Sequence, residues 1–218
     1  YWADDAHFDS VEIIVINDAT ARTAALQSGQ VHIINRVEPK VAGLLGRAPN
    51  IEVTSTAGRG HYVFIMHADT APFDNNELRL ALKYAINREE LNEIAFFGQG
   101  NPQQYVGFSP LPDFADPSLH GHMAQFDKDM ANAKLDAMGL ADTDGDGLRE
   151  LPSGGKLVLN LNFSTQGIAG QTVELVSQYW RDVGIDSVVK EVTPDEYRSA
   201  QSSNQLDVGM WQKGQPLG

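Results

Sequence analysis

The sequence contains no cysteine, and basic residues are few. The first absence excludes thiol catalysis, disulfide bonds and cysteine-ligated zinc. The 16 Lys and Arg are outnumbered by 29 Asp and Glu, which gives a formal net charge of −13. Nucleic acid and anionic lipid surfaces are bound through clustered Lys and Arg, so we expect neither as a partner. An acidic surface of this kind is typical of a soluble protein.

Long apolar runs and catalytic motifs are also missing from the sequence. No run approaches the roughly 18 apolar residues that a membrane-spanning helix needs, so we expect no membrane insertion. The sequence has no G-x-S-x-G, no H-E-x-x-H and no phosphate-binding loop. Its carboxylates fall mostly at helix starts and turns, where helix capping explains them. The sequence therefore predicts a protein that is not an enzyme.

The pattern of short β-rich runs and helices predicts an α/β fold. In the first part of the chain, strands are expected over residues 11–16, 31–34 and 51–56, with helices over 19–28 and 37–45. After the glycines at 58 and 60, another strand is expected over residues 62–66. Further on, we expect strands over 156–162, 185–192 and 206–211, and helices over 127–138, through 173–183 and from 194.

The clearest helix begins near Asp74, which forms a capping-box pattern with Glu77. The apolar side chains behind it recur with the period of one helix face, which predicts that Leu78, Leu82 and Ile86 are buried. The polar side chains that we expect to be largely exposed are Lys83, Arg88 and Glu89.

The segment DTDGDGLRE, residues 142–150, has the alternating carboxylates of a calcium loop. Asp142, Asp144 and Asp146 could direct oxygens at one cation, and Glu150 could be a further, partial ligand. Against this, the twelfth loop position is Ser153, where calcium loops of this type carry a bidentate Glu. The alternative is a plain Asp/Gly turn before the next strand, and both interpretations stay open at this point.

Several motifs occur in an order that resembles one known family. They include ATARTAALQSGQVHII at 19–34, APFDNNELRLALKYAINREE at 71–90, GQGNP at 98–102 and DTDGDGLRE at 142–150. Together they resemble the family 5 extracellular solute-binding proteins, which bind peptides, nickel complexes, opines and related solutes. The resemblance covers nearly the whole chain.

This resemblance implies a type II periplasmic-binding-protein-like α/β fold, with part of a first lobe and most of a second. On that map, 1–58 is a strand–helix–strand part of the first lobe, 59–211 is the second lobe, and 212–218 is a truncated crossover back to the first. The implied function is capture of a peptide or similar small solute in a cleft between lobes and delivery to the membrane permease of an ABC importer. The implied location is the periplasm or, in a Gram-positive source, the extracytoplasmic side of the cell membrane, where the protein is anchored as a lipoprotein. No cofactor is implied.

The resemblance also implies where the solute would bind. Trp211 corresponds to a tryptophan near the cleft, although packing in the core would explain it equally well. Ser164, Thr165 and Gln166 follow a strand and precede a helix, whose first backbone amides could hold a polar group. His67, Arg59 and Tyr62 could also face the cleft. No basic residue lies between Lys156 and Arg181, so an Arg–carboxylate contact from this segment is not expected.

A different class of function remains as the alternative. If the Asp142–Glu150 loop were the main feature, the chain would be a calcium-stabilised structural or adhesion module. Removal of calcium should then unfold the protein, because a metal that binds only the native state stabilises it by mass action. A solute-binding protein should respond little to a chelator.

Overall fold

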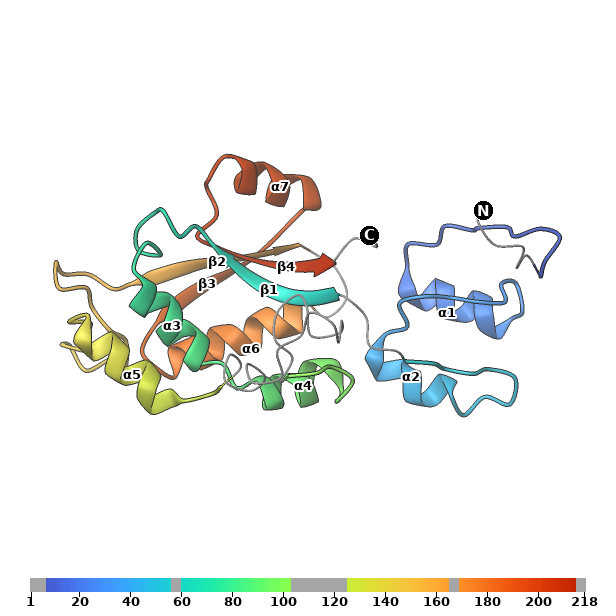
Figure 1. Ribbon diagram of the computed structural model, residues 1–218, viewed down its shortest axis with the longest axis horizontal. Helices are drawn as coiled ribbons and strands as arrows, with labels where there is room; N and C mark the ends of the chain where they lie inside the picture. Colours follow the sequence, from blue (N-terminus) through green and yellow to red (C-terminus); the bar gives the residue numbers. More distant parts are fainter. Residues whose placement is uncertain (1–6, 56–59, 103–124, 165–168, 215–218) are drawn as a thin grey trace. The chain divides into compact units, whose positions relative to one another are not determined.

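The computed structural model describes residues 7–55, 60–102, 125–164 and 169–214 (Figure 1). The chain divides into two compact units, Tyr1–Thr54 and Ser55–Gly218, and each is considered by itself. Within the described parts, no helix combines the length and apolar character needed to cross a membrane.

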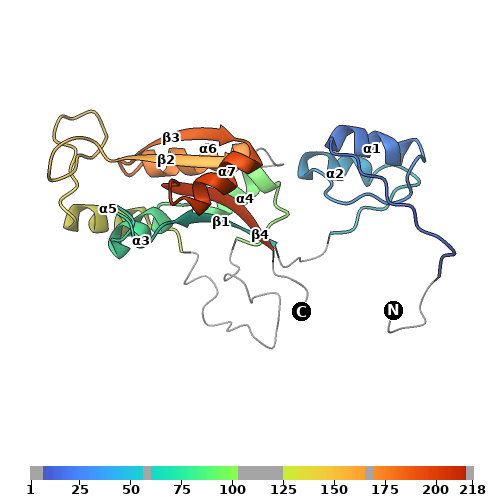
Figure 2. The same cartoon turned by 90° about the horizontal axis from the view of Figure 1, so that it is seen from above.

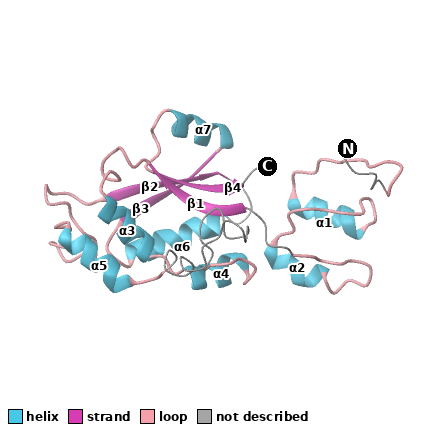
Figure 3. Ribbon diagram, in the orientation of Figure 1, coloured by secondary structure: helices cyan, strands magenta, loops and turns pink. Residues whose placement is uncertain are grey.

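The first unit contains two helices, α1 (Ala19–Gln27) and α2 (Pro39–Leu45), close to their expected places. Asp18 begins α1 by accepting a hydrogen bond from the Ala21 amide at 2.7 Å. The expected strands over 11–16, 31–34 and 51–56 are wrong for the described residues, which form no strand there (Figure 3). An extended segment becomes a strand only when a neighbour pairs with its amides and carbonyls, and the described part of this unit provides no such pairing.

The second unit contains a four-stranded mixed sheet in the order β1-β4-β2-β3. β4 pairs antiparallel with β1 and parallel with β2, and β2 pairs parallel with β3. The strands are β1 (Gly60–Met66), β2 (Val158–Ser164), β3 (Asp186–Val192) and β4 (Val208–Gly214). β1, β2 and β3 lie close to expected strands, and β4 continues past residue 211, where the expected strand stopped.

Five helices surround this sheet in the described part of the unit. They are α3 (Asn76–Tyr84), α4 (Arg88–Phe96), α5 (Lys128–Ala137), α6 (Ala169–Arg181) and α7 (Pro194–Ser202). α7 lies on one face of the sheet and α6 on the other, as Figures 1 and 2 show. The expected capping box of α7 is present, with Thr193 and Glu196 bonded to each other's backbone amides.

Helix α3 confirms the expected apolar face and corrects its polar details. Leu78, Leu82 and Ile86 are buried, as predicted. The capping residue is not Asp74 but Asn75, whose Oδ1 accepts a hydrogen bond from the Glu77 amide at 2.9 Å.

Lys83 and Arg88 are half-buried, so their predicted exposure is wrong, whereas Glu89 is exposed as expected. Arg88 turns back over the end of α3, where its Nη1 donates to the carbonyls of Lys83 and Ile86 at 3.2 and 3.3 Å. The carbonyls at a helix end lack partners within the helix, which explains why this cation is drawn inward.

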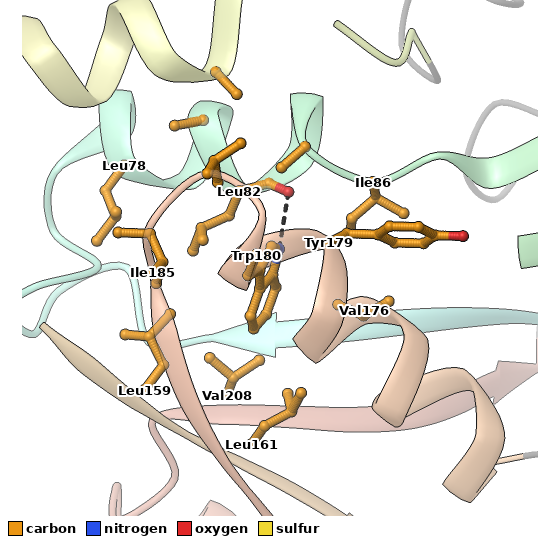
Figure 4. Close-up of a cluster of buried hydrophobic side chains, with 14 of the residues drawn as sticks. Leu78, Leu82, Ile86, Leu159, Leu161, Val176, Tyr179, Trp180, Ile185 and Val208 are labelled. Carbon is orange, nitrogen blue, oxygen red and sulfur yellow. Dashed lines mark hydrogen bonds between the residues drawn. The ribbon is translucent and has the colours of Figure 1, made fainter. Parts of the chain in front are cut away.

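Trp180 of α6 is the centre of the core (Figure 4). Its side chain is fully buried, and its ring meets Phe64 of β1 edge-on, with 6.0 Å between ring centroids. Its Nε1 donates a hydrogen bond to the Leu82 carbonyl at 3.0 Å. One side chain thus ties α6 to α3 and to the sheet.

Candidate functional site

Three of the expected solute-binding residues lie at the same end of the sheet, on three neighbouring strands. β2 and β4 are parallel and terminate at this end, and the antiparallel β1 begins there. Phe163 pairs with Met210 and Val63 with Trp211, so Tyr62, Ser164 and the backbone of Trp211 lie at the same end. We call these three positions the carboxyl edge. In open α/β sheets, ligands bind outside the carboxyl ends of the strands.

Ser164 is the last residue of β2, and its side chain is buried. It is 6% exposed, and its Oγ has no hydrogen-bond partner in the described structure. Leaving a buried hydroxyl unsatisfied costs about 1–3 kcal/mol. Helix α6 begins five residues later, at Ala169. This edge therefore offers a hydroxyl and the start of a helix to a polar group of a ligand.

Tyr62 contributes an aromatic surface to the same edge. Its ring meets Phe96 of α4 edge-on, with ring centroids 5.3 Å apart. Gln171, in the first turn of α6, donates to the Ile94 carbonyl of α4 at 3.2 Å and fixes the end of that helix beside the edge. Phe97, which follows Phe96 in sequence, is 51% exposed and has a left-handed backbone conformation with φ of 53°.

The sequence reasoning missed Phe96 and Gln171 as neighbours of this edge. The one available signal was the pair of aromatic residues directly before Gly98, at a helix end. Their contact with Tyr62 depends on how α4 packs against β1, which no local pattern reveals.

The remaining expected positions do not join this cluster. His67 follows Met66, which pairs with Val208 at the opposite end of β1, so the structure separates His67 from Ser164. Its Nε2 is buried and lacks a hydrogen-bond partner in the described residues. Arg59, Thr165 and Gln166 lie outside the described residues, as does the environment of the Trp211 side chain.

The acidic loop between α5 and β2 forms a second cluster, at the amino end of β2 (Figure 1). One carboxylate oxygen from each of Asp142, Asp144, Asp146 and Glu150 lies within 4.8 Å of the others. Lys156 forms an ion pair with Asp146 and lies 3.8 Å from Asp144. The hydrogen bond from Lys156, followed by that from the Leu148 amide, lowers the pKa of Asp146.

Comparison with known proteins places these features in one family. The model of the bacterial extracellular solute-binding proteins, family 5, matches residues 1–216. The glutathione-binding protein GsiB of Pectobacterium atrosepticum is 29% identical over 140 residues, which are 64% of this chain and 26% of that protein. The heme-binding protein A of Haemophilus influenzae is 31% identical over 114 residues, 51% of this chain and 20% of that protein.

Solved structures show the same fold. The chain superimposes on NikA of Brucella suis, in complex with Fe(III)-EDTA, with a TM-score of 0.81 and 18% identity, covering 99% of this chain and 44% of that one. For the oligopeptide-binding protein AppA of Bacillus subtilis, in complex with a nonapeptide, the TM-score is 0.74 at 22% identity, covering 91% and 40%. The chain thus spans less than half the length of these proteins. The expected type II periplasmic-binding fold is confirmed, and the adhesion-module alternative gains no support.

Proposed function

Because the chain belongs to the family 5 bacterial extracellular solute-binding proteins, we propose that it takes part in capturing a peptide or similar small solute for an ABC importer. The observation that carries this proposal is the match of the family model to residues 1–216. The named relatives bind glutathione and heme, and the named structures hold an oligopeptide and a metal chelate. A peptide-like solute suits the carboxyl edge best, for the following reasons.

The carboxyl edge has an aromatic surface on the face that α6 covers and a buried hydroxyl on the other face, because Ser164 follows Phe163, which packs on Gly170 of α6. Tyr62 and Phe96 provide an aromatic wall, against which an apolar side chain or the flat face of a peptide group can pack. Ser164 provides a buried hydroxyl that can donate to or accept from a peptide group. We propose Thr165, Gln166 and Arg59 as further contacts, because they lie close to Ser164 or Tyr62 in sequence, and Trp211, because its backbone pairs with Val63 at the same end of the sheet. His67 is a weaker candidate, because it lies at the opposite end of β1.

The proposed role involves no chemical conversion of the solute. In such proteins, a solute that prefers the closed arrangement of two lobes drives a hinge motion toward it, and the closed form docks on a membrane permease. We propose the same order of events for this protein: solute binding, closure of the lobes and docking on the permease. We propose that these events take place in the periplasm or, in a Gram-positive cell, on the outer face of the cell membrane, where the protein is anchored.

Saturation-transfer NMR with the 218-residue chain tests this proposal, because it detects weak binding. Pockets commonly enclose 70–90% of a small ligand, and an edge on one unit offers less, so we expect dissociation constants of about 1 mM. The panel comprises dipeptides, glutathione, a tetrapeptide, a disaccharide and a nickel–histidine complex. We expect magnetisation transfer to at least one peptide.

Substitutions at the carboxyl edge, with a serine control elsewhere, test whether the peptide binds at this edge. Ser164→Ala should weaken transfer to the peptide, and Tyr62→Ala should abolish it. Ser177→Ala removes a partly buried hydroxyl that bonds Ser187 at 2.8 Å, near the other end of the sheet, and should leave transfer unchanged. Transfer to no solute in the panel, or conversion of a solute into a product, would contradict the proposal.

A further inference from the structure

Phe97, directly after α4, combines two features that the stability of the fold does not favour. Its side chain is 51% exposed, and its backbone is left-handed, with φ of 53° and ψ of 39°. A left-handed backbone costs free energy for a residue with a Cβ, and a bulky residue there is an outlier. Glycine at this position would relieve the strain, and a polar side chain would suit the exposure. Because backbone strain of this kind clusters at binding sites, Phe97 needs a functional explanation.

The backbone around Phe97 is held in place by Asn92 of α4. The Asn92 side chain is buried, and its Oδ1 accepts a hydrogen bond from the Gly100 amide at 2.8 Å. The Asn92 carbonyl accepts another from the Gly98 amide at 3.1 Å. A Cβ at Gly100 would lie 2.5 Å from Asn92 Oδ1, so the helix and the segment after it are in close contact. Phe97 therefore sits on a fixed backbone, and little further ordering accompanies a contact with its ring.

The end of α4 lies at the same end of the second unit as the beginning of β1, as Figures 1 and 2 show. Phe96 contacts Tyr62 there, with ring centroids 5.3 Å apart. Ile94, about one helical turn before Phe97, is itself 39% exposed, and its carbonyl accepts a hydrogen bond from Gln171 of α6 at 3.2 Å. The exposed side chains of Ile94 and Phe97 thus adjoin the aromatic surface of the carboxyl edge and extend it toward solvent.

The charges near these side chains favour an apolar group and disfavour an acidic one. The carboxylate oxygens of the exposed Glu93 lie 3.6 and 3.7 Å from the position that a Cβ would take at Gly98, directly after Phe97. The cation of α4 is Arg88, which is at the other end of the helix. An acidic side chain or a peptide carboxylate would be repelled by Glu93, whereas an apolar side chain can pack on the ring of Phe97.

We propose that Phe97 is a specificity-determining residue, whose ring packs, together with Ile94, against one apolar side chain of the captured peptide. This inference rests on the proposed function, because it names the peptides that the carboxyl edge prefers. The preferred peptide carries a side chain such as that of leucine next to the part bound by Tyr62 and Phe96. In this account the ring of Phe97 serves binding, and the fold bears the strain of its backbone.

Saturation-transfer NMR titrations of the 218-residue chain with tripeptides test the role in binding. Trialanine is compared with the three tripeptides in which one alanine is replaced by leucine and the three in which it is replaced by aspartate. We expect the unaltered chain to bind at least one leucine peptide about fivefold more tightly than trialanine, and no aspartate peptide more tightly.

Variants assign this preference to Phe97. Phe97→Gly and Phe97→Asn both remove the ring and both tolerate a left-handed backbone, so each should lose the preference for leucine. The control Phe126→Ala removes a phenylalanine that is 46% exposed, just before α5, and should keep the preference.

Thermal unfolding separates this role from a structural one. Because glycine relieves the left-handed strain, the unfolding midpoint of Phe97→Gly should equal or exceed that of the unaltered chain. A fall of more than about 3 °C would show that the ring packs as part of the fold, and it would overturn the proposal. The proposal also fails if peptides bind but the unaltered chain shows no preference for leucine, or if both variants keep that preference; the proposed function would then stand. Binding of no peptide at all would overturn the proposed function and this inference with it.

Discussion

The two units of the chain bury their apolar side chains to very different extents. In residues 55–218, a continuous cluster that includes Leu82, Leu161, Val176 and Trp180 is almost inaccessible to water. In residues 1–54, Ala25 and Leu45 are the buried hydrophobic residues of the described part, whereas the large exposed ones are Phe8, Val11, Ile13, Ile14, Val15, Ile33 and Leu44. Since burial of apolar surface dominates the stability of a fold, the second unit should account for most of the stability of this chain.

The comparison also shows how a strand-like sequence behaves without a partner. Residues 11–16 and 158–164 are both β-rich, yet only the second segment forms a strand in the described structure. Leu159 and Leu161 of β2 lie between β3 and β4 and pack on α6, whereas Ile13 and Val15 are 85% and 82% exposed. A strand gains its stability from neighbours on both edges and on its buried face.

Removing Trp180 should have the largest effect on stability. Trp180→Ala deletes a fully buried ring and its hydrogen bond to Leu82, so we expect a loss of about 3–5 kcal/mol in the free energy of unfolding. Urea unfolding followed by circular dichroism measures this loss. A loss below about 1 kcal/mol would mean that the second unit does not carry the stability of the chain.

A methyl group at Gly209 should have the next largest effect. A Cβ at this position of β4 would lie 2.9 Å from Tyr197 Cζ and closer still to its hydroxyl, and Tyr197 is a fully buried residue of α7. Overpacking of this kind costs about 1–3 kcal/mol, so Gly209→Ala should lower the unfolding midpoint. Adding Tyr197→Phe removes the clashing hydroxyl and should restore part of the loss. If the double variant is no more stable than Gly209→Ala, the clash lies elsewhere.

Alkaline pH should destabilise the second unit through two buried tyrosines. Burial raises the pKa of both Tyr179 and Tyr197 from 10.0 to about 12. Above pH 10 the unfolded chain loses these protons while the folded chain keeps them, so stability falls as pH rises from about 10 to about 12. Thermal unfolding across this range should show a smaller decline for the Tyr179→Phe, Tyr197→Phe double variant. An equal decline in both proteins would contradict this assignment.

The smallest effect is expected in the first unit. Ile13→Thr and Val15→Thr change side chains that are already exposed, so each should alter the free energy of unfolding by less than about 0.5 kcal/mol. Urea unfolding of these two variants and of Trp180→Ala under the same conditions compares the effects of substitutions in the two units. A loss above about 1 kcal/mol from either substitution would show that the first unit has a core that its exposed side chains do not reveal.

Local patterns predicted the parts of the structure that depend on neighbours in sequence. The spacing of Leu78, Leu82 and Ile86 predicted a buried helix face, and Thr193 with Glu196 predicted a helix start, because both signals arise within two turns. The half-burial of Arg88 was not predictable in this way, because it follows from the turn between α3 and α4.

The candidate site depended on contacts that sequence does not display. Tyr62 and Ser164 lie about a hundred residues apart, and the pairing of β1 and β2 with β4 brings them to one edge. The acidic loop was recognisable because its carboxylates lie within nine residues, whereas the ion pair between Lys156 and Asp146 became visible only in the structure.

Hydrogen exchange of the 218-residue chain, followed by mass spectrometry of its peptides, tests most directly the claim that the candidate site is built on a unit that is stable by itself. A protected amide exchanges only when the unit that contains it unfolds, so its exchange rate reports the free energy of unfolding of that unit. We expect β2, β4 and α6 to exchange slowly and together, and residues 11–16 and 31–34 to exchange within seconds. Rapid exchange in β2 and β4, or equally slow exchange in the two units, would contradict the account.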